Sequence, residues 1–318
     1  MSEHKIVRNS LWGIVLAGGE GKRIDPFVRT RYGLRSPKQY IAFTGKRSML
    51  QHTLHRVEKR IPPERTLIVV NPSHIQDIKA QLYGGSHTII FQPYNRETAP
   101  GVLLPLIHIF KRDPEARIAI FPSDHFIEEE DRFMSYVSLG DEVVQDFPDQ
   151  IVILGIRPEG PEVEYGWIEP ADAVSGYPDG GVKRVRRFFE KPDRQLAQKF
   201  FQEGYLWNSF VSIVKAKTLI EMTKACLPHI WGHFERMLAA IGTDRELPVI
   251  EEEYRGMEGA NLSRTVFEKK ARNISVVEVE DVYWSDWGDG ERVISTLKRF
   301  GKLPLHLLSE DIPVQQAS

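Results

Sequence analysis

The chain has 318 residues, 41% of them hydrophobic and 27% charged, which is typical of a folded protein with one large or two smaller α/β domains. Its formal net charge of −2 provides no general attraction for nucleic acid or an anionic membrane, so any polyanion site must be built locally. The N-terminal segment MSEHKIVRNS lacks an apolar core, and no apolar run reaches the ~18 residues of a membrane span; we therefore expect a cytoplasmic protein. A single cysteine, Cys226, excludes an internal disulfide and a cysteine-based metal cluster, and we expect its thiol to be buried or half-buried.

In chain order, short apolar and β-branched runs predict strands buried on both faces, at residues 13–17, 66–70, 88–91, 117–121 and 151–156. Helical patterns lie between them. In residues 48–60, Leu50, Leu54 and Val57 fall on one helical face, and residues 100–112 form a second helix candidate. This alternation predicts an α/β, doubly wound, mostly parallel (Rossmann-like) sheet with helices on both faces.

The second half of the chain has a different composition. Glycine, proline and acidic residues dominate residues 157–181, and the later candidate strands and helices lie at residues 182–191, 193–203, 216–226 and 274–279. No linker rich in Pro, Gly or Ser separates the parts, so we expect one domain over residues 8–301, with halves 8–156 and 157–301. Residues 302–318 have weak periodicity and are predicted to be a surface tail.

A glycine-rich loop, GGEGKR at residues 18–23, directly follows the first predicted strand. Gly18, Gly19 and Gly21 permit positive φ and carry no side chains, so their backbone N–H groups can converge on an anion. The spacing matches neither the Walker P-loop nor the G-x-G-x-x-G dinucleotide motif. A plain tight turn is the alternative interpretation.

Basic residues follow the glycine loop. Against two acids, Glu20 and Asp25, this stretch contains six cations: Lys22, Arg23, Arg29, Arg31, Arg35 and Lys38. Arginine forks and lysine charges suit a polyphosphate, and ligands of such sheets bind at the carboxyl ends of the strands. The pattern therefore favours a polyphosphate site over a solvated basic loop.

The segment FPSDHFI, residues 121–127, places Asp124 directly after a predicted strand. An acidic residue in this position either caps a turn or belongs to a site. A bound polyphosphate brings Mg²⁺, and Mg²⁺ needs carboxylates, so the basic loop upstream favours the site. We expect the neighbouring His125 to be a structural hydrogen-bonding residue, because Mg²⁺ prefers oxygen ligands.

Eight short blocks along most of the chain resemble, in the same order, the motifs of the sugar-1-phosphate nucleotidyltransferases. The blocks are LAGGEGKR (16–23), SPKQ (36–39), QPYNRETAPG (92–101), FPSDH (121–125), EYGWIEP (164–170), FFEKP (188–192), LWNS (206–209) and YWSDWGD (283–289). The combination of SPKQ, R-x-T-A-P, PSDH and WSDWG resembles the mannose-1-phosphate guanylyltransferase branch. The sequence departs from that branch at Gln92 (usually Glu), Glu97 (usually Asn), Phe210 (usually Gly) and in residues 261–269, which lack the usual Asp-Tyr.

The resemblance implies a Mg²⁺-assisted in-line attack of a sugar 1-phosphate on the α-phosphorus of an NTP. The implied substrates are GTP and mannose 1-phosphate, and the products are GDP-mannose and pyrophosphate. By resemblance, Arg23, Lys38 and Asp124 are catalytic, and Asp124 and Asp286 hold Mg²⁺, with Asp289 as a competitor for the second position. The remaining implied contacts are with the nucleotide, by Gly18, Gly19, Gly21, Gln92 and Thr98, and with the sugar, by Gly166, Glu190, Lys191 and Asn208.

Other functions stay open at this stage. One alternative is the same chemistry with another base or hexose 1-phosphate. Another is a non-catalytic nucleotide-sugar sensor or regulatory subunit, which would bind without turnover; the glycine spacing argues against a Rossmann dehydrogenase. The resemblance also implies that residues 8–156 mainly bind the nucleotide and that residues 157–301 form a smaller, β-rich sugar-binding part. It implies a homodimer by analogy alone, and we expect neither an isomerase domain nor a hexapeptide-repeat β-helix in 318 residues.

Overall fold

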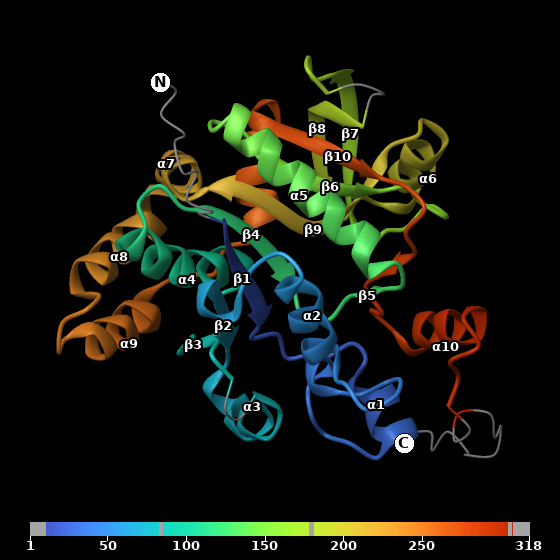
Figure 1. Cartoon of the computed structure of the whole chain (residues 1–318), viewed down its shortest axis with the longest axis horizontal. Coiled ribbons are helices and arrows are strands. Elements are labelled where there is room, and N and C mark those ends of the chain that lie inside the picture. Colours follow the sequence, from blue (N-terminus) through green and yellow to red (C-terminus); the bar gives the residue numbers. More distant parts are fainter. Residues whose placement is uncertain (1–10, 83–84, 178–180, 305–306, 308–318) are drawn as a thin grey trace, which may run out of the picture.

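The computed structural model describes residues 11–82, 85–177, 181–304 and 307. These residues form a nine-stranded sheet in the order β3-β2-β1-β4-β9-β6-β10-β8-β7 (Figure 1). The strands of this sheet are β1 (Leu11–Ala17), β2 (Thr66–Val70), β3 (Thr88–Phe91), β4 (Arg117–Pro122), β6 (Ile151–Ile156), β7 (Gly166–Ala173), β8 (Val182–Glu190), β9 (Leu206–Lys215) and β10 (Ile274–Val279). A separate two-stranded sheet pairs β5 (Phe126–Ile127) with β11 (Trp284–Ser285).

Most strands of the described sheet run in one direction. β1 pairs in parallel with β2 and β4, β2 with β3, and β6 with β10. β9 is antiparallel to β4 and β6, and β8 is antiparallel to β7 and β10. Only β8 and β9 of this sheet, as described, oppose the others, which confirms the mostly parallel prediction. β9 joins the two halves of the sheet.

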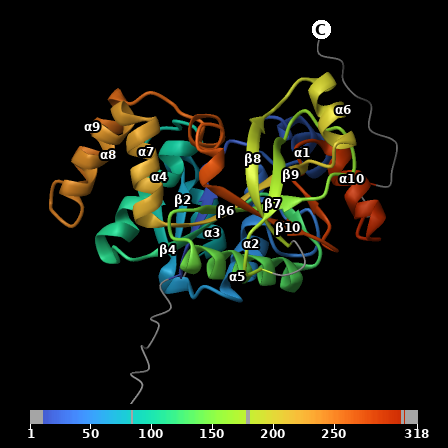
Figure 2. The same cartoon turned by 90° about the horizontal axis from the view of Figure 1, so that it is seen from above.

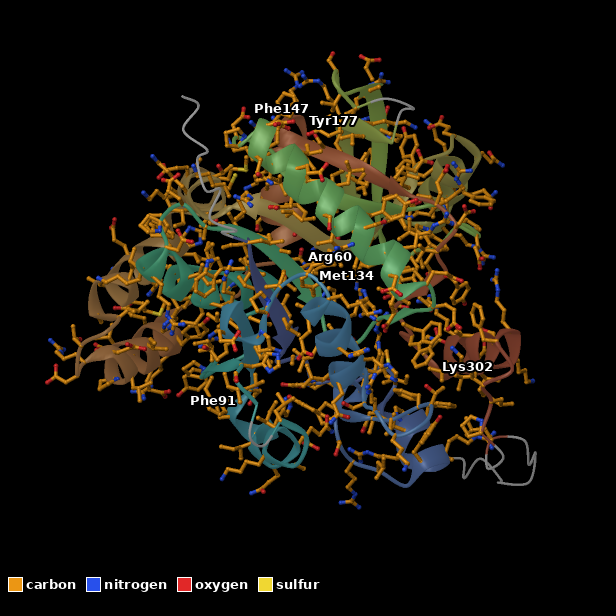
Figure 3. The ribbon with its side chains drawn as sticks, viewed as in Figure 1. Arg60, Phe91, Met134, Phe147, Tyr177 and Lys302 are labelled. Carbon is orange, nitrogen blue, oxygen red and sulfur yellow. The ribbon has the colours of Figure 1, made fainter. Side chains whose placement is uncertain are left out.

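Helices cover both faces of the sheet. The described helices are α1 (Asp25–Tyr32), α2 (Met49–Glu58), α3 (Ile75–Leu82), α4 (Thr98–Arg112), α5 (Glu130–Asp146), α6 (Arg194–Gln202), α7 (Ala216–Cys226), α8 (Pro228–Ala240), α9 (Glu246–Gly256) and α10 (Gly290–Arg299). Side chains of α4, α7, α8 and α9 pack with Ile14 and Ile153, whereas those of α2 and α5 pack with Val15 and Val152. Neighbouring strand residues point to opposite faces, as the two-residue period of a strand requires. Figure 2 shows α4 and α7 on one side of the sheet and α5 on the other, and Met134 of α5 lies in the layer facing α2 (Figure 3).

The sequence predicted β2, β3, β6, β10 and α7 with the observed bounds. It missed β9, because Asn208, Ser209 and Ser212 interrupt its apolar run although the strand is buried on both faces, and the sequence indicates only the LWNS motif there. It also missed α1, which lies inside the basic stretch and has one buried residue, Val28. It also missed α5, although the helical spacing of Phe133, Val137 and Val144 in the sequence indicates this helix.

The remaining expectations concern the thiol and the chain ends. Cys226 is half-buried and packs against the main apolar core, as expected. Within the described residues, no helix is long and apolar enough to cross a membrane. Leu303 and Leu307 pack in an apolar cluster with side chains of α1 and α10. Residues 8–10 of the predicted domain, and residues 305–306 and 308–318 of the predicted tail, lie outside the described residues.

Candidate active site

The glycine loop lies at the carboxyl end of β1 and is folded against the basic segment that follows it. Gly21 has a φ of 62°, and a Cβ there would lie 3.1 Å from the backbone nitrogen of Lys38, so only glycine fits without strain. The buried Gln39 amide donates to the main-chain oxygens of Ala17 (2.9 Å) and Gly19 (2.7 Å). These contacts fix the conformation of the loop and bring Lys38 beside it.

The two predicted metal-binding carboxylates meet at one place, although 162 positions separate them in sequence (286 − 124). Asp124 follows β4, and Asp286 follows β11, whose Trp284 pairs with Ile127 of β5 in antiparallel register. Lys38 Nζ lies 3.0 Å from Asp124 Oδ2 and also donates to the main-chain oxygen of Asp286. The small β5–β11 ladder therefore assembles the site.

The charges at this site stabilise each other. Burial favours the neutral form of both carboxyl groups, but the Lys38 ammonium outweighs it and holds the pKa of Asp124 below its ordinary value. Lys38 and Arg292 together lower the pKa of Asp286 to about 2 against the same effect of burial. Lys38 itself is only 4% exposed. At neutral pH the site thus holds two carboxylates beside a buried ammonium.

Arg23 approaches Asp286 from the glycine loop. Its Nη2 lies 3.5 Å from Asp286 Oδ2, and its Nη1 donates to Glu164 Oε2 at 2.7 Å. Lys191 Nζ lies 3.6 Å from the same Glu164 oxygen. Because 55% of the Arg23 side chain is exposed, a ligand can reach its guanidinium group.

The predicted sugar-binding residues come from the ends of β7, β8 and β9. Gly166 pairs with Glu190 in the β7–β8 register, and a Cβ at Gly166 would lie 3.1 Å from Glu190 Oε2 and 3.3 Å from Asn208 Cβ. Lys191 follows directly after β8. Asn208 Oδ1 accepts a hydrogen bond from the backbone N–H of Phe210 at 3.0 Å. Phe210 has a φ of 63°, in the region that favours glycine, which explains why the resembling motif has glycine there.

The two residues predicted to contact the base have different surroundings. Gln92 is buried beside the glycine loop: a Cβ at Gly18 would lie 3.8 Å from Gln92 Oε1, and one at Gly101 would lie 3.3 Å from it. Thr98 is the first residue of α4, and its hydroxyl accepts a hydrogen bond from the backbone N–H of Leu262 at 2.9 Å. The structure therefore places Gln92 against the loop, while the Thr98 hydroxyl ties α4 to another segment.

Sequence reasoning missed the side chains that surround Asp286. Tyr165 Oη and Arg292 Nη1 donate to Asp286 Oδ1 at 2.8 and 2.7 Å. Tyr165 lies inside the EYGWIEP block, which could have indicated it, whereas Arg292 lies in none of the eight blocks. Asp289, the predicted competitor for the metal, is the N-cap of α10 and accepts from the backbone N–H of Arg292 at 2.9 Å.

His125 supports the site by packing. Its ring meets Trp284 edge to face, with the ring centres 5.1 Å apart, and burial lowers its pKa. Its Nε2 is 3.8 Å from Asp124 Oδ1, and its buried Nδ1 has no hydrogen-bond partner among the described residues. Nδ1 therefore does not make the predicted structural hydrogen bond, and the ring packs against Trp284 through an aromatic contact.

The chain is similar to several known proteins. The sequence profile of the Nucleotidyl transferase family matches residues 12–299. The mannose-1-phosphate guanylyltransferase of Escherichia coli K12 is 29% identical over 297 residues, which are 89% of this chain and 59% of that protein. The ManC mannose-1-phosphate guanylyltransferase of Salmonella typhimurium LT2 is 30% identical over 295 residues, which are 88% of this chain and 58% of that protein.

A solved structure from Thermus thermophilus, described as a mannose-1-phosphate geranyltransferase, superimposes with a TM-score of 0.77 at 29% identity. The match covers 90% of this chain and 79% of that one. The chain spans less than two thirds of the length of the curated relatives it matches. Since the family profile covers nearly the whole chain, the chain belongs to the Nucleotidyl transferase family.

Proposed function

We propose that the protein transfers a guanylyl group from GTP to mannose 1-phosphate, giving GDP-mannose and pyrophosphate. The observation that carries this proposal is the meeting of Asp124 and Asp286 at the Lys38 ammonium, next to the glycine loop. The names of the relatives at 29 and 30% identity support the choice of GTP and mannose 1-phosphate. The geometry supports the reaction class: two anions have to be brought together, so the protein's main tasks are positioning and charge neutralisation.

The residues of this chain have distinct tasks in that reaction. The backbone of Gly18, Gly19 and Gly21 would bind the triphosphate, with Arg23 neutralising the leaving pyrophosphate. Lys38 would exchange its contact with Asp124 for an oxygen of the reacting phosphates. The attacking oxygen of the sugar phosphate is already an anion, so no side chain has to remove a proton from it.

The proposed substrate contacts divide between the two halves of the chain. We propose that Gln92 and Thr98 contact the base, and the surroundings of Gln92 beside Gly18 support the first assignment better than the second. The proposed sugar contacts are Gly166, Glu190, Lys191 and Asn208. Gly166 allows close approach, Glu190 accepts from sugar hydroxyls, and Asn208 offers an amide donor because its oxygen is bonded to Phe210.

The donor set fits a divalent cation, and we propose Mg²⁺. Asp124 and Asp286 supply carboxylate oxygens, the ligands this cation prefers, and their low pKa values keep them ionised. In the described part of the chain, no group of three or more His, Cys, Asp or Glu side chains is arranged to hold a metal; this suits a cation that is completed by substrate phosphates and water. When bound, a cation held by Asp124 and Asp286 would supply Lewis-acid stabilisation of the phosphate charge.

The test is a substrate matrix. Purified protein is incubated with Mg²⁺, with GTP, ATP, UTP or dTTP, and with several hexose 1-phosphates, and pyrophosphate release is followed. GTP with mannose 1-phosphate is expected to have the highest kcat/KM. A different best pair would refute the specificity, and nucleotide-sugar binding without any turnover would favour the regulatory alternative. The homodimer and the cytoplasmic location stay predictions; light scattering after size exclusion checks the first.

A further inference from the structure

The two oxygens of the Asp286 carboxylate have unequal surroundings. Oδ1 accepts three hydrogen bonds, from Tyr165 Oη (2.8 Å), the backbone N–H of Gly288 (2.9 Å) and Arg292 Nη1 (2.7 Å). Oδ2 has a looser neighbour, Arg23 Nη2 at 3.5 Å. Three donors satisfy one oxygen, so the other is the oxygen left to face a cation.

The backbone of Gly288 lies close to this carboxylate. A Cβ at Gly288 would lie 2.7 Å from Asp286 Oδ2 and 3.2 Å from Oδ1. The carboxylate therefore lies directly over a residue that has no side chain. Turning the plane of the carboxylate about its Cβ–Cγ bond would break the three bonds to Oδ1, so the observed plane is favoured.

Arg292 is itself held in place, so it can fix the orientation of another group. Its Nη2 donates to Glu162 Oε2 at 2.5 Å, and its Nε lies 3.2 Å from Asp289 Oδ2. Its Nη1 also donates to Tyr165 Oη at 3.0 Å, and its guanidinium carbon lies 4.9 Å from the centre of the Tyr165 ring. Only 22% of the side chain is exposed. Arg292 thus links α10, the Glu162 loop and Asp286.

Arg299 offers a matched comparison on the same helix. It lies seven residues, about two turns, further along α10. Its Nη1 bonds Glu159 Oε1 at 2.8 Å, and its guanidinium carbon lies 4.5 Å from the centre of the Tyr283 ring. Both arginines therefore connect α10 with the Glu159–Glu162 region and an aromatic ring. They differ because Arg292 also contacts Asp286.

We infer that Arg292 is a positioning residue which, together with Tyr165, locks the Asp286 carboxylate so that Oδ2 is presented to the divalent cation. This inference rests on the proposed function, because it takes Asp286 as a metal ligand. Groups that hold a metal ligand by its second oxygen raise metal affinity by removing the ligand's rotational freedom and aiming its free lone pairs. Helix α10 therefore belongs to the active site, although it carries no ligand of its own.

The experiment measures Mn²⁺ binding directly. Mn²⁺ alone is titrated into the full-length protein, and the free ion is followed by electron paramagnetic resonance for the wild type, Asp286→Asn, Arg292→Met and Arg299→Met. We expect a Mn²⁺ site that Asp286→Asn removes and that Arg292→Met weakens about tenfold in Kd. Arg299→Met is expected to change Kd by less than about twofold, because its ion pair is exposed and distant from the ligand.

Tyr165→Phe is the second variant, since it keeps the ring and removes a single donor. Its Kd for Mn²⁺ is expected to rise about threefold, the effect of one hydrogen bond. Thermal unfolding of all variants accompanies the titrations. A purely structural Arg292 would lower the Tm as Arg299→Met does and leave Kd unchanged, which would overturn the inference; so would wild-type Mn²⁺ binding that does not depend on Asp286.

The inference and the proposed function can fail separately. GDP-mannose formation is assayed on the same preparations. If the wild type binds Mn²⁺ through Asp286 with the expected dependence on Arg292 but makes no nucleotide sugar, the proposed function fails and the inference stands. If it makes GDP-mannose while Arg292→Met binds Mn²⁺ like the wild type, the inference fails and the function stands.

Discussion

The two halves of the chain, residues 8–156 and 157–301, position their site residues by different means. In the first half, the glycine loop and Asp124 lie at the carboxyl ends of parallel strands, and main-chain contacts such as those of Gln39 set the loop's shape. In the second half, Asp286 follows a two-residue strand and is held by side chains, chiefly Tyr165 and Arg292. Backbone placement can be read from local sequence, whereas side-chain placement depends on partners from distant segments. The following predictions test this difference.

The largest effect is expected at Asp124, because both the proposed cation and Lys38 depend on it. Asp124→Asn keeps the shape of the side chain and removes its charge. We expect kcat to fall at least about 10³-fold, since cation and phosphate charge would no longer be balanced at this point. Pyrophosphate release measures the change, and circular dichroism checks that the variant is folded. Unchanged turnover would refute the proposed active site.

Lys38 and Lys22 provide the next comparison, between a buried and an exposed cation of the same basic stretch. The Lys38 ammonium bonds Asp124, whereas the Lys22 side chain is 84% exposed and pairs with Glu20. We expect Lys38→Met to lower kcat about 10²-fold and Lys22→Met to lower it less than about twofold, because an exposed charge is screened by solvent. The two variants are compared by kcat in the same assay, and equal losses would mean that the whole stretch acts as one diffuse positive field.

The junction between the halves is predicted to be sensitive to added volume. Gly155 lies in β6, and a Cβ there would be 2.6 Å from Val276 Cγ2 and 2.8 Å from Leu206 Cδ1. Gly155→Ala is expected to lower the free energy of unfolding by about 2 kcal/mol through overpacking. Gly160 has no neighbour within 4 Å of such a Cβ, so Gly160→Ala is the control, with a change below about 0.5 kcal/mol. Urea denaturation measures both, and equal stability of the two variants would contradict the close packing at β6.

The smallest expected effect concerns Glu190 and pH. Burial raises the pKa of Glu190 above its ordinary value of 4.5, against the lowering effect of Lys191 and Arg264. The folded state therefore holds the proton more tightly, so ionisation of Glu190 costs stability as pH rises from about 4.5 through the raised pKa. The side chain introduced by Glu190→Gln cannot ionise. The difference in stability between this variant and the wild type should therefore shift in favour of the variant between pH 4 and pH 8. Urea denaturation at both pH values measures this difference in stability. A difference that is independent of pH would show that burial does not raise the pKa of Glu190.

Most strands could be predicted from the sequence, since runs such as residues 66–70 and 151–156 are apolar and β-branched throughout. The strand β9 could not, because buried polar residues interrupt its apolar run, and its position between β4 and β6 follows from the topology of the whole sheet. In the site, Gly21 and Asp124 follow from their places after strand ends, whereas Lys38 is one of six cations in the basic stretch and its role was implied by the resemblance. The N-cap role of Asp289 could also have been read from its place before α10.

The sequence by itself predicted a polyphosphate site, because glycines, cations and an aspartate near strand ends are local features of the chain, and the resemblance of its motifs to a known family implied the reaction class. Only the tertiary structure decided that Asp286 meets Asp124, since the β5–β11 ladder that joins them pairs residues far apart in the chain. It also decided which oxygen of Asp286 stays open, because that depends on Arg292 and Tyr165, which the fold brings from two different elements. A local motif can place a carboxylate in the chain, but the orientation of that carboxylate is set by side chains that meet only after folding.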